Sequence, residues 1–428
     1  MGENTMKPGV EPAPISTADN TALGLENALS GAEFDGIICI GGEDWWYHNR
    51  GHFDFQIMRR LAKRWPVLFV NSLGVRMPSL SDKGLFAKRI GRKLKSFSRG
   101  VTNVENKFWV FSPLSVPGEA VRKFNASSLS PQIRLAAFRA GIRKPLLWVH
   151  CPAGVDVIDS LPHTGLVFQR TDRFESFPEG DPVVLKQQVD TLRARADLVV
   201  YAAPHLQDEE CQSVKRSLLV THGVDVERFR AAGAKTQTIG PRDIAHLKRP
   251  RVGFIGGIDA HTFDPDLFLS VAGMLPDHQF ILVGGCSLQE DWCQLENVRA
   301  VGRKPYEVVA DYMAAMDCLI MPWNRSEWIA ACNPIKLKEY LAVGRPVVSR
   351  PFQALKPYEG VVRVADDAAT FASAVREACV QPYDGTQALA LVAQEDWDAK
   401  VGLVADALCR LHKPVTDNGE YEEARTAA

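Results

Sequence analysis

The stretch FDGIICIGG, residues 34–42, decides the fold, because it is a short apolar run that ends in two glycines. Such a run predicts a buried parallel strand followed by a glycine turn. Helical spacing follows at Phe55, Met58 and Leu61, and a second apolar run, VLFV, follows at residues 67–70. A strand, a helix and a strand within about forty residues form a right-handed crossover unit.

Two series of such runs divide the chain into two domains. The first series continues at residues 108–111, 146–149, 166–168 and 198–201. The second starts with RVGFIGG at residues 251–257, which repeats the pattern of the first strand, and continues at residues 280–283, 318–321 and 346–349. The sequence therefore predicts two Rossmann-like, doubly wound α/β domains that face each other across a cleft.

Changes in this pattern set the domain boundaries. We expect a disordered N-terminal tail at residues 1–33, an N-terminal Rossmann-like domain at residues 34–228 and a linker at residues 229–248. A C-terminal Rossmann-like domain is expected at residues 249–385, helices that pack back on the first domain at residues 386–412, and a loose tail at residues 413–428.

Composition argues against several classes of protein. The net charge of −1 is not that of a general nucleic-acid binder, which would be strongly basic. We expect no membrane span and no signal peptide, because the chain has no apolar run of about eighteen residues and no basic-then-apolar start. The nine cysteines form no Cys-x-x-Cys pair, so we expect buried thiols in a reducing compartment.

The block NPIKLKEYLAVGRPVV, residues 333–348, is typical of a helix that begins at a ligand. Pro334 suits the first turn, with Asn333 as the N-cap. A positive charge at Lys336 is then unfavourable by a few tenths of a kcal/mol, because it lies at the positive end of the helix dipole. A bound anion such as a diphosphate would compensate this cost. Glu339 lies on the same face and can accept hydrogen bonds from two ribose hydroxyls. A solvated Lys–Glu pair is the alternative.

Glycine pairs end two strands of the second domain, at residues 256–257 and 284–285. Gly256 and Gly257 would let backbone N–H groups approach a phosphate without obstruction by a Cβ atom. A tight turn explains the pair equally well. Neither domain has the GxGxxG spacing of a dinucleotide site, which argues against a dehydrogenase.

These residues resemble the nucleotide-sugar site of GT-B glycosyltransferases, especially the family 4-like enzymes of bacterial exopolysaccharide assembly. The teichuronic-acid type and the xanthan glucuronosyltransferase type share the pattern Asn-Pro-x-Lys…Glu-Tyr-x-Ala-x-Gly-x-Pro-Val with residues 333–347. The resemblance implies that Lys336 neutralises the diphosphate and that Glu339 holds the ribose. The implied donor-nucleotide site comprises Gly256, Gly257, Arg303, Tyr306, Asn333, Lys336 and Glu339. We expect no cofactor and no metal, because the nucleotide sugar is a substrate and Lys336 meets the leaving-group charge.

One position departs from the family pattern. Family 4 enzymes usually carry a second acid eight residues before the ribose-binding one, where this chain has Ala331. The nearest acid, Glu327, lies twelve residues before Glu339 (339 − 327). Because that acid normally contacts the donor sugar, the resemblance leaves both the sugar and the choice between retention and inversion open.

A catalytic base is expected in the first domain. Asp172 follows the apolar run at residues 166–168 and resembles an aspartate of these transferases that can deprotonate an acceptor hydroxyl. A local pair with Arg170 or Arg173 is the alternative. Two residues nearer the N-terminus, Asp44 and His52, are reserve candidates for the same role.

Aromatic and cationic residues follow the first strand and would face the cleft. Trp46, Arg50 and His52 suit a saccharide acceptor, although interdomain packing would use the same residues. The motif Asp264-Pro265-Asp266 has the Asp-x-Asp spacing of a metal site in other transferases. It precedes an apolar helix, so capping of that helix explains it better.

A basic amphipathic stretch lies in the first domain. Residues 76–99 contain eight basic residues and one acid, with Phe86, Ile90, Leu94 and Phe97 at helical spacing. Such a helix can bind an anionic bilayer, at about 1 kcal/mol for each basic residue near the surface. We therefore predict that residues 83–99 bind an anionic membrane surface, with a solvated helix over the core as the alternative.

Together these features predict a glycosyltransferase of the hexosyltransferase class. It would move a sugar from a nucleotide diphosphate sugar, with UDP preferred, to a polysaccharide or lipid-linked saccharide in bacterial surface polysaccharide synthesis. We expect it in the cytoplasm, peripheral on the inner face of the plasma membrane, and not on nucleic acid. The alternatives are a sugar-nucleotide epimerase on the same fold and a catalytically degenerate transferase that acts as an assembly partner, which Ala331 suggests.

Overall fold

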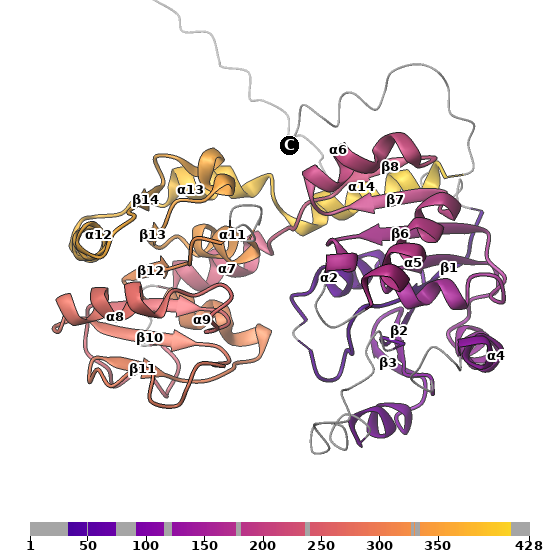
Figure 1. The fold of residues 1–428 in the computed structure, drawn as a ribbon, viewed down its shortest axis with the longest axis horizontal. Coiled ribbons are helices and arrows are strands. Elements are labelled where there is room, and N and C mark those ends of the chain that lie inside the picture. Colours follow the sequence, from indigo (N-terminus) through magenta and orange to yellow (C-terminus); the bar gives the residue numbers. More distant parts are fainter. Residues whose placement is uncertain are drawn as a thin grey trace, which may run out of the picture.

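The computed structural model consists of two α/β lobes (Figure 1). It describes residues 33–48, 50–73, 91–114, 122–176, 181–235, 240–326, 329 and 334–411. We call the lobe built on the first sheet domain 1 and the lobe built on the second sheet domain 2.

Domain 1 contains an eight-stranded sheet in the order β3-β4-β2-β1-β5-β6-β7-β8, parallel except where β3 pairs with β4. Its strands are β1 (Gly36–Ile40), β2 (Val67–Val70), β3 (Thr102–Glu105), β4 (Phe108–Phe111), β5 (Pro145–Val149), β6 (Gly165–Arg170), β7 (Leu198–Tyr201) and β8 (Ser217–Leu219). β1 lies between β2 and β5, so the carboxyl end of β1 is at the middle of one sheet edge.

Helices cover both faces of this sheet, which explains why β1 is apolar at every position. Ile37 and Cys39 pack in one cluster with α2 and α14, whereas Ile38 and Ile40 pack in another with α4 and α5. The helices of domain 1 are α2 (Phe53–Leu61), α4 (Arg122–Arg139), α5 (Pro182–Arg195), α6 (Pro204–Glu210) and α14 (Trp397–Cys409), with the short 3-10 turns η2 (Pro152–Asp156), η3 (Phe174–Ser176) and η4 (Cys211–Ser213). Residues 91–97 are also helical.

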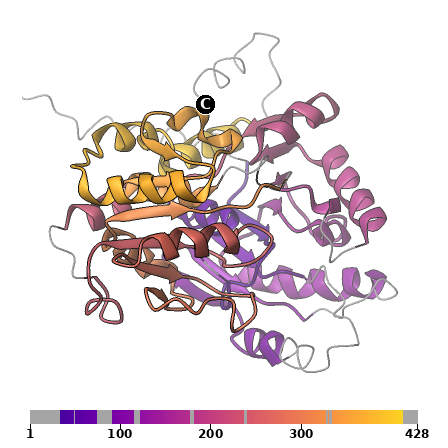
Figure 2. The same ribbon diagram turned by 60° about the vertical axis from the view of Figure 1, so that its left-hand side comes forward.

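Domain 2 contains a six-stranded parallel sheet in the order β11-β10-β9-β12-β13-β14. Its strands are β9 (Arg251–Ile255), β10 (Gln279–Val283), β11 (Val298–Ala300), β12 (Cys318–Met321), β13 (Val347–Ser349) and β14 (Val362–Val364). Its helices are α7 (Val226–Ala234), α8 (Pro265–Met274), α9 (Tyr306–Ala314), α11 (Ile335–Ala342), α12 (Ala368–Val380) and α13 (Thr386–Ala393), with the 3-10 turn η5 (Gln353–Tyr358). Helices α8 and α12 lie side by side (Figure 2).

The predicted fold class, two doubly wound α/β domains, is confirmed. The structure differs from the predicted boundaries in two places. Residues 229–248 are not a separate linker, because α7 and the segment after residue 240 pack in the domain 2 core, where Phe229 and Ile244 are fully buried. Of the helices at residues 386–412, only α14 packs on domain 1, whereas α13 lies in the domain 2 core through Ala388 and Val392.

Two smaller points concern helices. The predicted capping role of Asp264 is confirmed, because its carboxylate accepts a hydrogen bond from the Leu267 amide at 2.9 Å and so caps α8. In the part of the chain that the structure describes, no helix is both long and apolar enough to cross a bilayer.

Candidate active site

Helix α11 places Lys336 in its first turn, as the sequence predicts. The helix begins one residue later than expected, with Pro334 rather than Asn333 at the N-cap, and Asn333 lies outside the described residues. Tyr340 fixes α11 to β9: its hydroxyl accepts a hydrogen bond from the Ile255 amide at 2.8 Å and donates to the Ile255 carbonyl at 3.3 Å. The first turn of α11 is therefore held beside the carboxyl end of β9.

The ammonium group of Lys336 lies against Gly256. A Cβ atom at Gly256 would overlap Nζ of Lys336, and a Cβ atom at Gly284 would overlap the Gly256 carbonyl oxygen. Glycine at both positions thus permits a close approach of two strand ends and one cation. Nζ also lies 4.6 Å from the ring centroid of Phe254 and 5.4 Å from that of Trp323, so aromatic faces hold the charge in place.

A second cation lies at the end of the next strand. The guanidinium of Arg303 lies against Gly285, where a Cβ atom would overlap its Nε. The Gly284 amide donates to the Gly302 carbonyl at 3.0 Å, which holds the Arg303 loop against β10. Two cations therefore lie at the carboxyl ends of adjacent parallel strands, where ligands of open α/β sheets bind.

Glu339 lies one turn after Lys336 and is 8% exposed. Burial raises the pKa of Glu339 to about 7, although Arg228 and Lys336 and a hydrogen bond with Tyr306 oppose the shift. A carboxylate with this degree of burial needs hydrogen-bond donors, and ribose hydroxyls are such donors.

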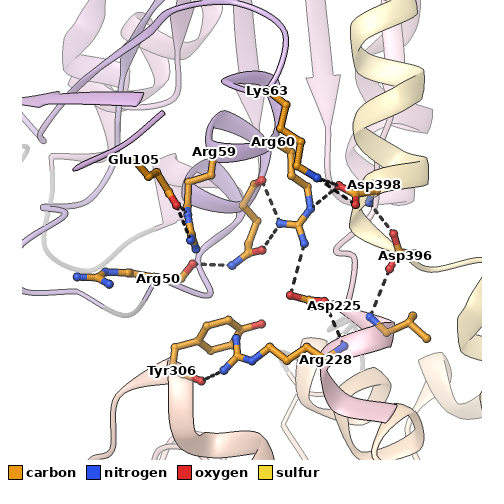
Figure 3. Close-up of polar contacts among 12 residues, drawn as sticks. Arg50, Arg59, Arg60, Lys63, Glu105, Asp225, Arg228, Tyr306, Asp396 and Asp398 are labelled. Carbon is orange, nitrogen blue, oxygen red and sulfur yellow. Dashed lines mark hydrogen bonds and ion pairs between the residues drawn. The ribbon is translucent and has the colours of Figure 1, made fainter. Parts of the chain in front are cut away.

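Arg228, whose charge acts on Glu339, lies at the junction of the domains beside Tyr306 and Asp225 (Figure 3). Its guanidinium donates to the Tyr306 carbonyl and lies 4.4 Å from the centroid of the Tyr306 ring. Its backbone amide donates to Asp225, and Asp225 forms an ion pair of 3.7 Å with Arg60 on α2 of domain 1. The predicted donor residues Tyr306 and Glu339 thus lie next to a charged network that reaches the other domain.

Domain 1 contains a buried pair that the sequence analysis missed, His150 and Asp54. Nδ1 of His150 lies 3.2 Å from Oδ2 of Asp54, and Nε2 lies 3.0 Å from the Thr171 hydroxyl. The same Asp54 oxygen accepts a hydrogen bond from the Gly42 amide at 3.2 Å. His150 follows β5 directly and Thr171 follows β6, so the pair lies at the carboxyl edge of the sheet.

Each member of the pair favours the charged form of the other. Burial would raise the pKa of Asp54, but the hydrogen bond and charge of His150 bring it below its usual value. Burial would lower the pKa of His150, but the hydrogen bond and charge of Asp54 hold it above its usual value. A histidine oriented by a buried carboxylate is one arrangement that can support proton transfer.

The predicted base, Asp172, is exposed and lies two residues after β6. Its charge contributes to the raised pKa of His150, so the two groups lie near each other. The local arginines form ion pairs elsewhere: Arg170 with Glu175 at 2.8 Å and Glu210 at 2.9 Å, and Arg173 with Glu209 at 2.6 Å.

The two reserve candidates have structural contacts. The Asp44 carboxylate accepts hydrogen bonds from the Trp46 amide at 2.9 Å and from the Ser96 hydroxyl at 3.1 Å, so it closes the loop after β1. His52 is exposed and is the N-cap residue of α2, without a hydrogen bond from its side chain to the helix.

The predicted acceptor residues lie near the domain boundary. Arg50 forms an ion pair of 3.0 Å with Glu307 of domain 2, so the loop between β1 and α2 meets the first turn of α9. The guanidinium of Arg99 lies 4.3 Å from the ring centroid of Trp46. Trp46 and His52 remain predictions for acceptor contact, whereas Arg50 takes part in the interdomain contact that was its alternative.

Comparisons with known proteins concern the second domain and the fold. Residues 249–380 match a family described as glycosyl transferases group 1. A protein of Bacillus subtilis (strain 168) that is named as a teichuronic acid biosynthesis glycosyltransferase, TuaH, is 30% identical over 175 residues, which are 39% of this chain and 43% of that protein. The match therefore spans less than half the length of that relative.

Solved structures resemble the whole two-domain arrangement. Sucrose-phosphate synthase from Thermosynechococcus elongatus has a TM-score of 0.60 at 15% identity, covering 92% of this chain and 100% of that one. The Anabaena protein HepE, in complex with UDP and glucose, has a TM-score of 0.57 at 15% identity, covering 88% and 99%. At these identities the likeness shows the fold. The chain has the GT-B fold, and residues 249–380, in its second domain, match the glycosyl transferases group 1 family.

Proposed function

We propose that the protein is a glycosyltransferase that uses a nucleotide diphosphate sugar, with UDP as the preferred nucleotide. The observation that carries the proposal is the cation of Lys336 held against Gly256, one helical turn from the buried carboxylate of Glu339. The family match of domain 2 and the curated relative named as a glycosyltransferase support it. HepE, of the same fold, was solved with UDP and glucose.

The chemistry at this site is stabilisation of a leaving group. Lys336 and Arg303 would neutralise the diphosphate as it departs from the sugar, which is the part of the reaction where negative charge develops. Glu339 would bind the ribose and so fix the nucleotide. The contact between Arg50 and Glu307 would bring the acceptor side towards the donor, because proximity of the reacting oxygen to the anomeric carbon lowers the barrier.

Asp172 and His150 are the groups that domain 1 offers to an acceptor hydroxyl. We propose Asp172 as the base and the His150–Asp54 pair as its neighbour in the acceptor site, because the charge of Asp172 contributes to the raised pKa of His150 and the groups therefore lie near each other. A base of this kind implies inversion at the anomeric carbon. NMR assignment of the product anomer tests this: a retained configuration would remove Asp172 from the role.

We further propose a polysaccharide or lipid-linked acceptor at the inner face of the plasma membrane. Residues 74–90, with Phe86 and Ile90, lie outside the described residues. In the described part, Leu94 is 54% exposed and Phe97 is 37% exposed, among Arg92, Lys95 and Arg99. Exposed apolar side chains between cations are typical of surfaces that bind anionic bilayers.

Vesicle sedimentation tests the membrane proposal. The protein should pellet with vesicles that contain anionic lipid and not with zwitterionic vesicles, and added salt should weaken the binding. Leu94→Asn combined with Lys95→Glu should reduce pelleting, whereas Lys186→Glu on α5 should not. Equal sedimentation with both kinds of vesicle would contradict the proposal.

A nucleotide screen tests the central proposal. UDP-sugars should raise the thermal midpoint of the protein more than GDP- or dTDP-sugars, because a ligand of the folded state stabilises it. Lys336→Met and Glu339→Gln should each reduce the shift, and Lys356→Met, which removes an exposed cation of domain 2, should leave it unchanged. The absence of a shift with every nucleotide would overturn the proposal. Release of UDP-linked sugar products without acceptor would instead indicate an epimerase.

A further inference from the structure

Two crossings of the chain between the domains run side by side. We call residues 221–224 and 395–397 the hinge. The Val224 amide donates to the Glu395 carbonyl at 2.8 Å, and the Trp397 amide donates to the Val224 carbonyl at 3.1 Å. A Cβ atom at Gly223 would come within 2.6 Å of the Trp397 indole, so the two crossings are in close contact.

Lys338 links this hinge to α11, the helix that carries Lys336 and Glu339. It lies between Lys336 and Glu339 in sequence, but its side chain is only 3% exposed and points to the crossings. Its ammonium donates to the His222 carbonyl at 2.7 Å and to Oε2 of Glu395 at 2.8 Å. One side chain of domain 2 therefore contacts both crossings.

The same carboxylate oxygen binds a second ammonium from the other side. Lys400 on α14 donates to Oε2 of Glu395 at 2.8 Å and to the Thr221 hydroxyl at 2.7 Å. Helix α14 belongs to the domain 1 core through Trp397 and Val401 (Figure 1). Glu395 thus joins a lysine from each domain. We call Lys338, Glu395 and Lys400 the hinge bridge.

The charges around the bridge show why stability alone does not account for it. Burial lowers the pKa of Lys338 to about 8, although Glu395 opposes the shift, so desolvation is a real cost at this position. Well-packed apolar residues often stabilise such a site as much as buried ions do. What an ion bridge adds is a fixed geometry between the groups that it connects.

We propose that Lys338 is a positioning residue: the hinge bridge fixes the helix that carries Lys336 and Glu339 relative to domain 1, and so couples nucleotide binding to the angle between the domains. The inference rests on the proposed function, because it assigns the nucleotide to α11. It predicts that removing the charge of Lys338 or of Lys400 has the same effect on the hinge, although the two lysines belong to different domains.

Hydrogen exchange of the unliganded full-length protein tests the bridge. Lys338→Met and Lys400→Met should each make exchange at the Val224 and Trp397 amides about tenfold faster, because each removes a charge-assisted hydrogen bond that holds the crossings. Exchange within the α11 segment that contains Tyr340 should not change. Lys235→Met, which breaks an ion pair of 3.0 Å with Asp311 inside domain 2, should leave the hinge amides unaffected.

Small-angle scattering with and without UDP adds a readout that a purely structural role would not change. UDP should compact the wild type but neither bridge variant, while UDP still raises the thermal midpoint of both variants. Faster exchange confined to α11 in Lys338→Met, with no effect of Lys400→Met on the hinge, would overturn the inference. Failure of the wild type to bind UDP would refute the proposed donor alone, because the exchange experiment contains no nucleotide.

Discussion

The first strands of the two domains, β1 and β9, both end in a glycine pair, yet different groups lie against these glycines. At Gly42 the amide donates to the carboxylate of Asp54, and the imidazole of His150 fills the space beside it. In domain 2 the ammonium of Lys336 lies against the first glycine of the pair, Gly256. The same turn therefore serves an internal carboxylate–imidazole pair in domain 1 and a cation in domain 2.

This difference suggests a division of labour. In domain 1 the Gly42 amide is already used by Asp54, so the turn has less capacity for a phosphate. In domain 2 the cation is held by aromatic rings and by glycine turns at two strand ends, which suits an anion. A glycine pair after a strand therefore indicates that another group lies close to the backbone there. The identity of that group determines the chemistry of the site.

The largest effect is expected when the cation of domain 2 is removed. Lys336→Met should lower kcat/KM for glycosyl transfer about 10²–10³-fold, the size of effect seen when one preorganised group that stabilises developing charge is removed. Steady-state kinetics measure it, with Lys356→Met as the matched control. A variant with unchanged kcat/KM would mean that Lys336 does not meet the leaving group.

The next largest effect is expected when the carboxylate of Asp54 in domain 1 is removed. Asp54→Asn should destabilise the protein by about 3 kcal/mol, because it leaves His150 buried without its charged partner. Urea unfolding near pH 6 measures the change, and nucleotide affinity should stay the same. The control Asp190→Asn, which breaks an exposed pair with Lys186, should cost at most about 0.5 kcal/mol.

The pH dependence of that stability has a definite sign. The raised pKa of His150 contributes stability that is complete below the ordinary value of 6.5 and is lost as pH rises through the folded-state pKa. The lowered pKa of Asp54 contributes stability that is complete above 3.8 and is lost as pH falls through its folded-state pKa. Asp54→Asn should therefore flatten the stability profile on both sides, and a variant with the wild-type profile would contradict the assigned pair.

A somewhat smaller effect is expected from the protonation of Glu339 when the nucleotide binds. Ribose hydroxyls favour the ionised carboxylate, so nucleotide binding should release a proton below about pH 7 and affinity should rise with pH up to that value. Without ligand the raised pKa has the opposite consequence. The contribution of Glu339 to the stability of the protein is complete below pH 4.5 and is lost as pH rises through about 7.

Calorimetry in buffers of different ionisation enthalpy measures the released proton. Glu339→Gln should bind the nucleotide more weakly and with no pH dependence between 5 and 8. An affinity of the wild type that does not change across that range would contradict the contact with ribose.

Sequence reasoning predicted how Lys336, Glu339 and the glycine pair of domain 2 are arranged, because these elements are local. Lys336 and Glu339 belong to one helix, and the glycine pair ends one strand, so spacing alone predicts how they are arranged. It missed the domain 1 pair, because Asp54 and His150 are 96 positions apart and meet only when β1 pairs with β5. A signal was present: Asp54 is a charged residue on the buried face of α2, and His150 follows an apolar strand directly.

The same reason explains the errors at the domain boundaries. The polar composition of residues 229–248 suggested a linker, but Phe229 and Ile244 supply enough apolar surface to anchor that segment in the domain 2 core. Lys338 and Glu395 also escaped notice, because a lysine and a glutamate 57 positions apart have no pattern that a sequence displays. Pairs of this kind depend on tertiary packing, which local periodicity does not report.

The smallest expected effect tests the two glycine turns directly. Gly256 has a φ of 158°, so alanine should cost some stability there, and because the added Cβ meets the end of the Lys336 side chain, donor affinity should fall about tenfold as the ammonium is displaced. In Gly42→Ala the added Cβ would lie 2.8 Å from Cε1 and Nδ1 of His150, an imidazole fixed on both sides by Asp54 and Thr171. That variant should lose about 1 kcal/mol of stability by overpacking and keep its donor affinity. Calorimetry and urea unfolding of both variants separate the two outcomes: if Gly42→Ala weakened UDP binding and Gly256→Ala did not, the assignment of phosphate to domain 2 and proton transfer to domain 1 would have to be reversed.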